Sequence, residues 1–224
     1  MNFSAFPCLC RIEGLIQGLR VDCVGRAKPG SFVGSRRCEV RGDHVAAFIM
    51  KVLSLGGSTS SESINRRFAR YAASLISEAD VTDLDLRTLE VPLYSVDLEE
   101  RDGAPADAQR FLDMIRSHDA IVISLAEHNG SYTAAFKNLY DWVSRIEQKL
   151  WSGKPMLLLA SSPGGRGGAT VLEAAKATFP RMGADLRASF SLPSFYDNFD
   201  AETGIRDAAL AQGLRDAVDA LTAA

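Results

Sequence analysis

From Lys51 onward, short apolar runs alternate with stretches in which apolar side chains recur every three or four residues. Uninterrupted apolar runs predict buried strands, and the recurring pattern predicts amphipathic helices. Strands are expected at 51–56, 81–86, 120–125, 156–160 and 186–190. Helical stripes are expected at 64–76, 111–118, 136–143, 171–179 and 210–221. Apolar strands separated by helices predict a parallel sheet that is covered on both faces.

Five successive strand-and-helix units suit an α/β fold, a flavodoxin-like doubly wound sheet of five parallel strands in the order 2-1-3-4-5 with helices on both faces. Ligands of such sheets bind at the carboxyl ends of the strands, near the point where the strand order reverses. The loops after the first, third and fourth strands are therefore the expected binding site.

Residues 1–49 differ from the rest of the chain. They hold all four cysteines, with seven basic and four acidic residues, whereas residues 50–224 hold 18 basic and 24 acidic residues. We expect an irregular N-terminal extension over 1–49 and one domain over 50–224. An alternative explanation is a mis-assigned start, because a good strand follows Met50 directly. The cysteine spacing matches no common zinc pattern, so no metal site is expected.

Composition narrows the classes of partner. The 224 residues carry a formal net charge of −3, which argues against a general nucleic-acid binder. No stretch approaches the roughly 20 apolar residues that span a bilayer, so no membrane partner is expected.

The loop after the first strand reads GGSTSSESIN over 56–65. It is neither GxGxxG nor a P-loop, but it places many hydroxyls at a helix N-terminus, where backbone N–H groups favour a phosphate. The alternative is that Ser63 only caps the helix.

The other two loops are polar or rich in glycine. Residues 126–133 read AEHNGSYT, in which Asn129-Gly130 is a turn pair and either Ser131 or Thr133 could cap the next helix. His128 has no evident nucleophile or metal partner, which favours a positioned polar or stacking residue over a catalytic one. Residues 161–168 read SSPGGRGG, whose glycines leave room for a planar ring or simply form turns.

Three stretches of residues 50–224 resemble the NAD(P)H-dependent FMN reductases, a flavodoxin-like family that includes chromate and quinone reductases and some azoreductases. They are GGSTSSESIN (56–65), LAEHNGSYTAAFKNLYDW (125–142) and SPGGRGG (162–168). The resemblance implies that FMN carries the chemistry, so no catalytic side chain is expected. It places the FMN phosphate on the first loop and the isoalloxazine ring between the other two. The implied cofactor-binding set is Ser58, Ser60, Ser63, Ile64, Asn65, Ala126, Glu127, His128, Asn129, Gly130, Ser162, Gly164 and Gly165.

The chain departs from the family pattern at two positions. Ser60 stands where the usual phosphate loop has Arg, and Ala126 and His128 replace the Pro and Tyr of a usual Pro-Glu-Tyr-Asn. Arg66 or Arg67 could compensate for the missing cation. The Leu93-Tyr94 segment falls where family members often approach the flavin or a partner subunit.

The resemblance implies that hydride passes from NADPH or NADH to flavin N5, and then electrons pass to a quinone, a free flavin or another small acceptor. It also implies a homodimer or homotetramer, and we expect a cytoplasmic enzyme. Two alternatives remain open, a non-enzymatic electron carrier of the flavodoxin type and a flavin-free binding module. For the latter, residues 195–199 (FYDNF) would form an exposed contact surface, although a contact between subunits is the favoured interpretation of this segment.

Overall fold

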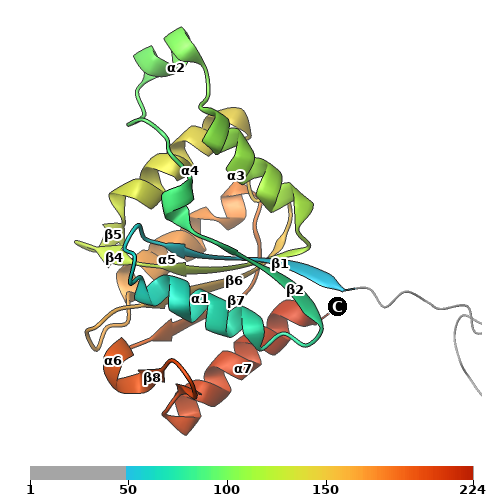
Figure 1. The fold of residues 1–224 in the computed structure, drawn as a ribbon, viewed down its shortest axis with the longest axis vertical. Helices are drawn as coiled ribbons and strands as arrows, with labels where there is room; N and C mark the ends of the chain where they lie inside the picture. The colour runs from blue at the N-terminus through green and yellow to red at the C-terminus, as the bar shows by residue number, and fades with distance from the viewer. Residues whose placement is uncertain (1–48, 224) are drawn as a thin grey trace, which may run out of the picture. The chain divides into compact units, whose positions relative to one another are not determined.

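The computed structural model describes residues 49–223, so the expectations for residues 1–48, their cysteines included, lie outside the described residues. Five parallel strands form one sheet in the order β2-β1-β3-β6-β7 (Figure 1). Their bounds are β1 Met50–Gly57, β2 Ala79–Leu84, β3 Ala120–Leu125, β6 Pro155–Ser161 and β7 Asp185–Leu192. In chain order this is 2-1-3-4-5, which confirms the predicted flavodoxin-like topology.

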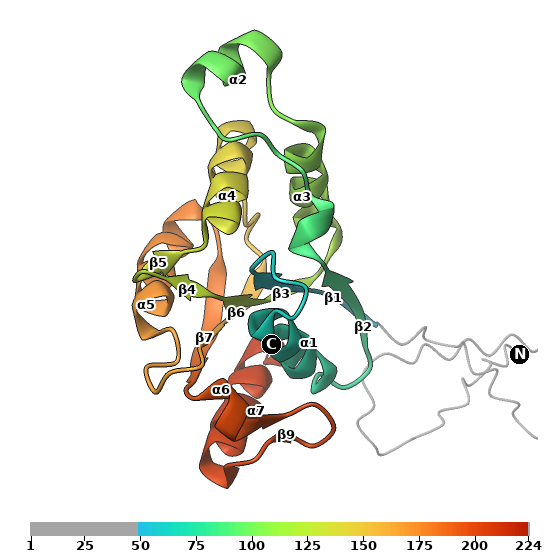
Figure 2. The ribbon, with the colours of Figure 1, turned by 60° about the vertical axis from the view of Figure 1, so that its left-hand side comes forward.

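Helices cover both faces of the sheet (Figures 1 and 2). Helices α1 (Ile64–Ser74) and α7 (Ala208–Thr222) pack on one face, and α3 (Ala106–Ser117), α4 (Ala134–Ile146) and α5 (Ala169–Thr178) pack on the other. Alternate residues of each strand serve the two cores: Val52 joins the α1 and α7 core, whereas Leu53 joins the other. Within residues 49–223, no helix combines the length and apolarity needed to cross a membrane.

Strand β2 ends earlier than the apolar pattern predicts. Asp85 follows it directly and accepts a hydrogen bond from the N–H of Arg87 at 3.0 Å. This cap starts the 3₁₀ turn η1 (Leu86–Thr88), in which Leu86 is buried. Leu86 therefore belongs to the turn. Because it is apolar and buried, the sequence pattern includes it in the strand.

Several short elements lie in segments for which the sequence predicts none. They are α2 (Val96–Asp102), the hairpin of β4 (Glu127–His128) and β5 (Ser131–Tyr132), η2 (Pro180–Met182), α6 (Phe195–Asn198), and the pair β8 (Phe199–Asp200) and β9 (Gly204–Ile205). Most of these are shorter than two helical turns or one ordinary strand, so they show no usable periodicity.

The expected contact surface at 195–199 is wrong for its two phenylalanines. Phe195 and Phe199 are buried, and their rings stack with centroids 4.8 Å apart. They join the core under α1 and α7, because β8 and β9 fold back against α1. Only Tyr196 of the three aromatic residues is exposed, with 63% of its surface accessible.

Helix α1 begins very close to the end of β1. A Cβ atom added to Gly56 would lie 2.4 Å from the backbone nitrogen of Arg66, so only glycine permits this approach. The close packing brings the first turn of α1 to the carboxyl edge of the sheet, beside the ends of β3 and β6.

Candidate functional site

The loops after β1, β3 and β6 meet at one edge of the sheet and line a cavity of about 200 Å³. A second hollow of about 490 Å³ adjoins it and shares Ser58, Ser60 and His128. Together they have the size of an ordinary cofactor site. Of the predicted residues, the cavity lining includes Ser58, Ser60, Ser63, Ile64, Asn65, Ala126, Glu127, His128 and Ser162. Asn129, Gly130, Gly164 and Gly165 lie in the same loops but outside that lining.

Four further residues line the cavity that the sequence analysis did not select. Glu62 and Ser161 adjoin selected residues, and Pro163 belongs to the glycine-rich loop. Tyr196 comes from α6, beyond the fifth strand of the sheet. The rule that ligands bind at the carboxyl ends of strands could have drawn attention to this fourth loop.

The loop 58–63 is folded by its own hydroxyls. The N–H of Ser60 donates to Ser58 Oγ at 3.2 Å, and the N–H of Glu62 donates to Ser60 Oγ at 3.3 Å. Ser63 Oγ accepts from the N–H of Arg66 at 3.1 Å, so Ser63 is the N-cap of α1. Ser63 therefore caps α1, and it also lines the cavity.

The first turn of α1 presents free donors. Within the described part of the chain, the N–H groups of Ile64 and Asn65 make no hydrogen bond to protein. Two backbone N–H groups at a helix N-terminus, with serine hydroxyls beside them, suit the phosphate of a nucleotide. The donor set therefore fits FMN at this end of the cavity.

The Asn65 side chain forms hydrogen bonds to the ends of β3 and β6. Its Oδ1 accepts from the Ser124 hydroxyl at 2.7 Å and from the Ser161 N–H at 3.0 Å, and its Nδ2 donates to the Ser161 carbonyl at 3.1 Å. All three residues are buried. Asn65 thus contributes its backbone to the cavity, and its side chain holds the ends of β3 and β6.

The loop after β3 forms the small β4–β5 hairpin. Asn129 and Gly130 have φ of 53° and 76°, which confirms the predicted turn pair. Thr133 caps α4, since its Oγ1 accepts from the N–H of Phe136 at 3.3 Å and donates to the Gly57 carbonyl at 2.8 Å. His128 is exposed and lines both hollows.

Glu127 connects the hairpin to the glycine-rich loop. Its Oε2 accepts from the N–H of Val171 at 3.0 Å, in the first turn of α5. The N-cap of α5 is Gly168, which has no side chain to do this. Glu127 therefore caps α5 from another loop and holds together the two segments that face each other across the cavity.

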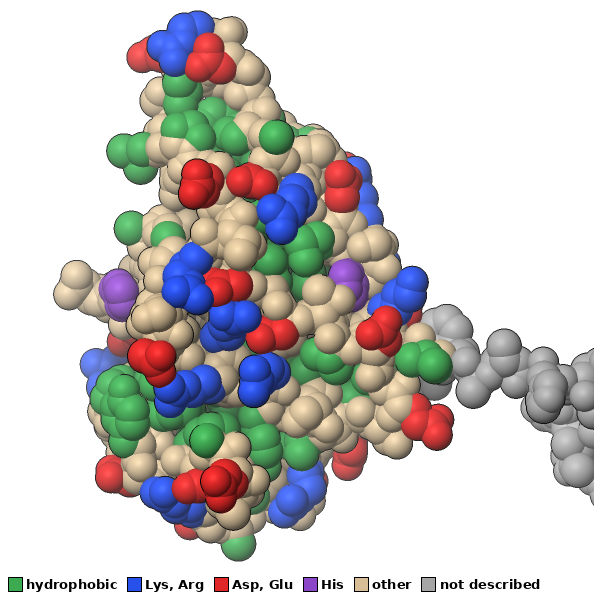
Figure 3. Space-filling model, in the orientation of Figure 1, with side chains coloured by type: hydrophobic (Ala, Val, Ile, Leu, Met, Phe, Trp, Pro, Cys, Tyr) green, Lys and Arg blue, Asp and Glu red, His purple; other side chains and the backbone are tan. Residues whose placement is uncertain are grey.

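Arg66 and Arg67, the two candidates for replacing the cation missing at Ser60, are both paired with carboxylates. Arg66 pairs with Asp83 at 3.1 Å and with Asp85 at 2.6 Å, and Arg67 pairs with Glu62. Figure 3 shows basic side chains gathered over α1 with acidic ones among them. The donors identified at this end of the cavity, the N–H groups of α1 and the serine hydroxyls, are therefore neutral.

The Asn138 and Trp142 positions of α4 hold the loop after β2. Asn138 Nδ2 and Trp142 Nε1 donate to the Pro92 carbonyl at 2.9 and 2.7 Å. The N–H of Tyr94 donates to Asn138 Oδ1 at 2.9 Å. The Tyr94 hydroxyl, and then Arg145, lower the pKa of Glu99. These positions anchor a loop and lie outside the cavity lining.

Comparison with known proteins identifies the family. The sequence profile described as NADPH-dependent FMN reductase matches residues 50–197. The chain belongs to this family. The match runs from β1 into α6, so it contains all three loops and Tyr196.

Individual relatives of this FMN reductase family member match about half of the chain, at about one third identity. It is 32% identical to a quinone reductase of Escherichia coli strain K12 over 120 residues, which are 54% of this chain and 64% of that protein. It is 34% identical to an NAD(P)H-dependent FMN reductase of Pseudomonas aeruginosa over 116 residues, which are 51% of this chain and 61% of that protein. The matches thus span less than two thirds of these relatives.

A solved structure with the same fold is the flavoenzyme NAD(P)H:acceptor oxidoreductase FerB from Paracoccus denitrificans. It matches with a TM-score of 0.62 and 26% identity, over 77% of this chain and 95% of that one. The flavodoxin-like fold of this family member is therefore shared over nearly the whole of FerB.

Proposed function

We propose that this chain is an NAD(P)H-dependent flavoprotein reductase that uses FMN and delivers electrons to a quinone, a free flavin or another small acceptor. The observation that carries the proposal is the meeting of the three loops around one cavity in a member of the NADPH-dependent FMN reductase family. When bound, FMN supplies the transfer of hydride from a reduced nicotinamide and of electrons onward.

The residues of the chain bind and orient the cofactor in this proposal. The N–H groups of Ile64 and Asn65, with the hydroxyls of Ser58 and Ser60, would hold the phosphate. The hairpin that contains His128 and the glycine-rich loop would flank the ring. Asn65 and Glu127 would keep these segments at a fixed separation through their side chains.

The test is an absorption spectrum followed by a turnover assay. The purified protein is incubated with FMN and desalted, with heat-unfolded protein taken through the same steps as a control. Flavin bands retained by the folded protein alone, and steady oxidation of NADH or NADPH with a quinone, are expected. A colourless folded protein would contradict the proposal and favour a flavin-free binding module. Retained flavin without nicotinamide oxidation would instead favour an electron carrier.

We also propose that the chain forms a homodimer or homotetramer. Leu93, which precedes α2, and Val96, its first residue, support this, because 83% and 56% of their surfaces are exposed. Light scattering of the purified protein is expected to give two or four times the chain mass of 24.2 kDa. A single-chain mass at micromolar concentration would contradict it.

The domain boundary and the location in the cell are proposals as well. We propose that the flavin-binding domain is 50–224, preceded by the extension 1–49, and that the enzyme works in the cytoplasm. The intact mass of the natively expressed protein tests the alternative start at Met50, which a mass that includes residue 1 would exclude. Cell fractionation tests the location, and recovery outside the cytoplasmic fraction would contradict it.

A further inference from the structure

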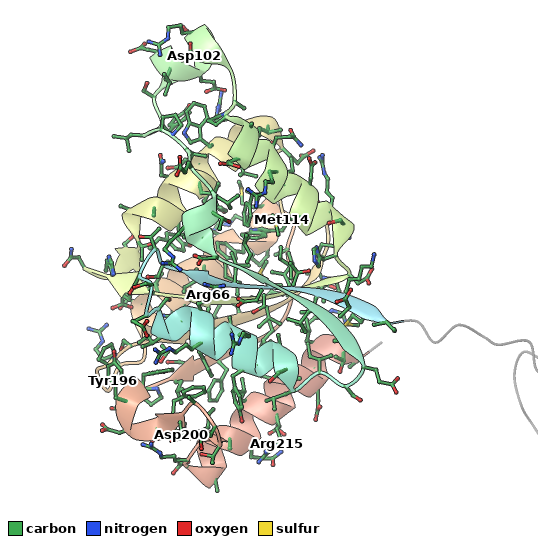
Figure 4. All side chains as sticks on the ribbon, viewed as in Figure 1. Arg66, Asp102, Met114, Tyr196, Asp200 and Arg215 are labelled. Atoms are coloured by element: carbon green, nitrogen blue, oxygen red, sulfur yellow. The ribbon has the colours of Figure 1, made fainter. Side chains whose placement is uncertain are left out.

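Tyr196 is an exposed aromatic side chain that the three-loop site does not explain. Large hydrophobic side chains are rarely exposed in the described residues, and this one, exposed over 63% of its surface, also lines the cavity. It reaches the cavity from α6, the segment that follows β7 (Figure 4). An exposed aromatic residue at the wall of a cavity suggests that a ligand covers it.

The backbone around Tyr196 is tied to the glycine-rich loop. The N–H of Phe195 donates to the Ser162 carbonyl at 3.0 Å, and the N–H of Ser194 donates to the Gly164 carbonyl at 3.0 Å. Ser194 has φ of 45°, a conformation that costs free energy for a residue other than glycine and persists only where its surroundings impose it. Tyr196 is therefore presented by a fixed turn.

The opposite side of the turn is also held. Arg206 donates to the carbonyl oxygens of Tyr196 and Asp197 at 3.3 and 3.1 Å. The buried ring of Phe195 meets the Tyr196 ring edge to face, with centroids 5.7 Å apart and an interplanar angle of 85°. The tyrosine ring is thus positioned before any ligand arrives, which lowers the entropy that binding must remove.

The glycine-rich loop beside this turn leaves open space. A Cβ atom added to Gly165 would meet nothing within 4 Å, and one added to Gly164 would meet only Ser162 Oγ, at 4.0 Å. The turn of Tyr196 is bonded to Ser162 and Gly164 of this loop, and the proposed function places the loop beside the flavin ring. Tyr196 is therefore assigned to the ring rather than to the phosphate.

We propose that the ring of Tyr196 contacts the isoalloxazine ring of bound FMN. This inference rests on the proposed function and adds a fourth loop to the binding site. Because the contact is with the ring, Tyr196 contributes to the binding of riboflavin, which lacks the phosphate, as much as to the binding of FMN.

The test measures dissociation constants of both flavins by titration calorimetry for the wild type, Tyr196→Ala, Tyr196→Phe and the control Ile49→Ala. Ile49 is an exposed apolar residue just before β1, outside the cavity lining. Tyr196→Ala is expected to weaken both flavins about tenfold, the usual scale for losing an aromatic stacking partner. Tyr196→Phe and Ile49→Ala should stay within about twofold of the wild type, because the ring or the whole site is kept. Unchanged thermal melting of each variant shows that the fold is intact.

Three results would overturn the inference. In the first, Tyr196→Ala binds both flavins like the wild type. In the second, Tyr196→Ala weakens FMN alone, which would place the side chain at the phosphate. In the third, Tyr196→Phe is as weak as Tyr196→Ala, which would make the hydroxyl the contact. A wild type that binds neither flavin would overturn the proposed function together with this inference, so the two failures are distinguishable.

Discussion

Asn65 satisfies both backbone polar groups of Ser161, a residue 96 positions later in the sequence. The carboxamide also accepts from the hydroxyl of Ser124. One buried side chain at the start of α1 therefore fixes the carboxyl ends of β3 and β6. The three loops of the candidate site are held in place by this contact before any cofactor binds.

Replacing Asn65 by Ala should destabilise the fold. The substitution leaves the buried N–H and carbonyl of Ser161 and the Ser124 hydroxyl without these partners, which we expect to lower the free energy of unfolding by about 2–4 kcal/mol. Guanidinium denaturation measures the change. The control is Gln212→Ala, an exposed amide on α7, for which a change below about 0.5 kcal/mol is expected. Equal effects of the two substitutions would contradict the role assigned to Asn65.

Replacing Glu127 by Ala should uncap α5. Loss of the bond to the Val171 N–H is expected to lower the free energy of unfolding by about 1 kcal/mol, and Glu127→Gln should lose less because it keeps an acceptor. Urea denaturation compares these variants with Glu173→Ala, which removes only an exposed pair with Lys176 on the same helix. The capping role would be wrong if Glu127→Ala were no more destabilising than Glu173→Ala.

Introducing Arg at position 60 should strengthen FMN binding through the phosphate. Since Arg66 and Arg67 are paired with carboxylates, we expect Ser60→Arg to tighten FMN about tenfold at low ionic strength, and less at high salt. Riboflavin affinity, measured by the same fluorescence titration, should not change. Tighter binding of both flavins, or of neither, would show that position 60 does not face the phosphate.

Replacement by Ala should destabilise the protein strongly at Gly56 and little at Gly165. Gly56→Ala would place Cβ 2.4 Å from the Arg66 nitrogen, so we expect it to lower the free energy of unfolding by about 3 kcal/mol or more. Gly165→Ala meets no atom within 4 Å, and a change below about 1 kcal/mol is expected. Thermal and chemical denaturation test the pair, and similar losses for both would contradict the close approach of α1 to β1.

Asp85 should give the protein an acid-sensitive component of stability. The Arg87 side chain, and then Arg66, hold the pKa of this carboxyl at about 2, below its usual 3.8. Because the folded state binds the proton less readily than the unfolded chain, this stabilisation is complete above about pH 4 and is lost as the pH falls towards 2. Denaturation at a series of pH values measures this component. The free energy of unfolding should fall less between about pH 4 and about pH 2 for Asp85→Asn than for the wild type. Parallel losses in the two proteins would refute this.

The local signals in the sequence located much of the site. The cap at Ser63 and the Asn129-Gly130 turn were identifiable, and the cap of α4 was narrowed to Ser131 or Thr133, because caps and turns depend on residues within a few positions of one another. The orientation of Arg66 was not identifiable, because its partners Asp83 and Asp85 follow another strand. The position of Tyr196 was not identifiable for a similar reason, since only the fold brings its turn against Ser162 and Gly164.

The sequence by itself indicated five parallel strands, the burial of both sheet faces and the three loops at the carboxyl edge, whereas the order 2-1-3-4-5 was inferred from the likeness of this pattern to the flavodoxin-like fold. It could do so because continuous apolar runs such as 120–125 and 156–160 must be buried, and alternating helices leave a parallel sheet as the way to bury them. Only the tertiary structure decided that Asn65 turns inward, that Glu127 caps a helix of another segment and that Tyr196 faces the cavity. These side chains are polar or lie in short elements without periodicity, so their partners are set by packing between distant segments.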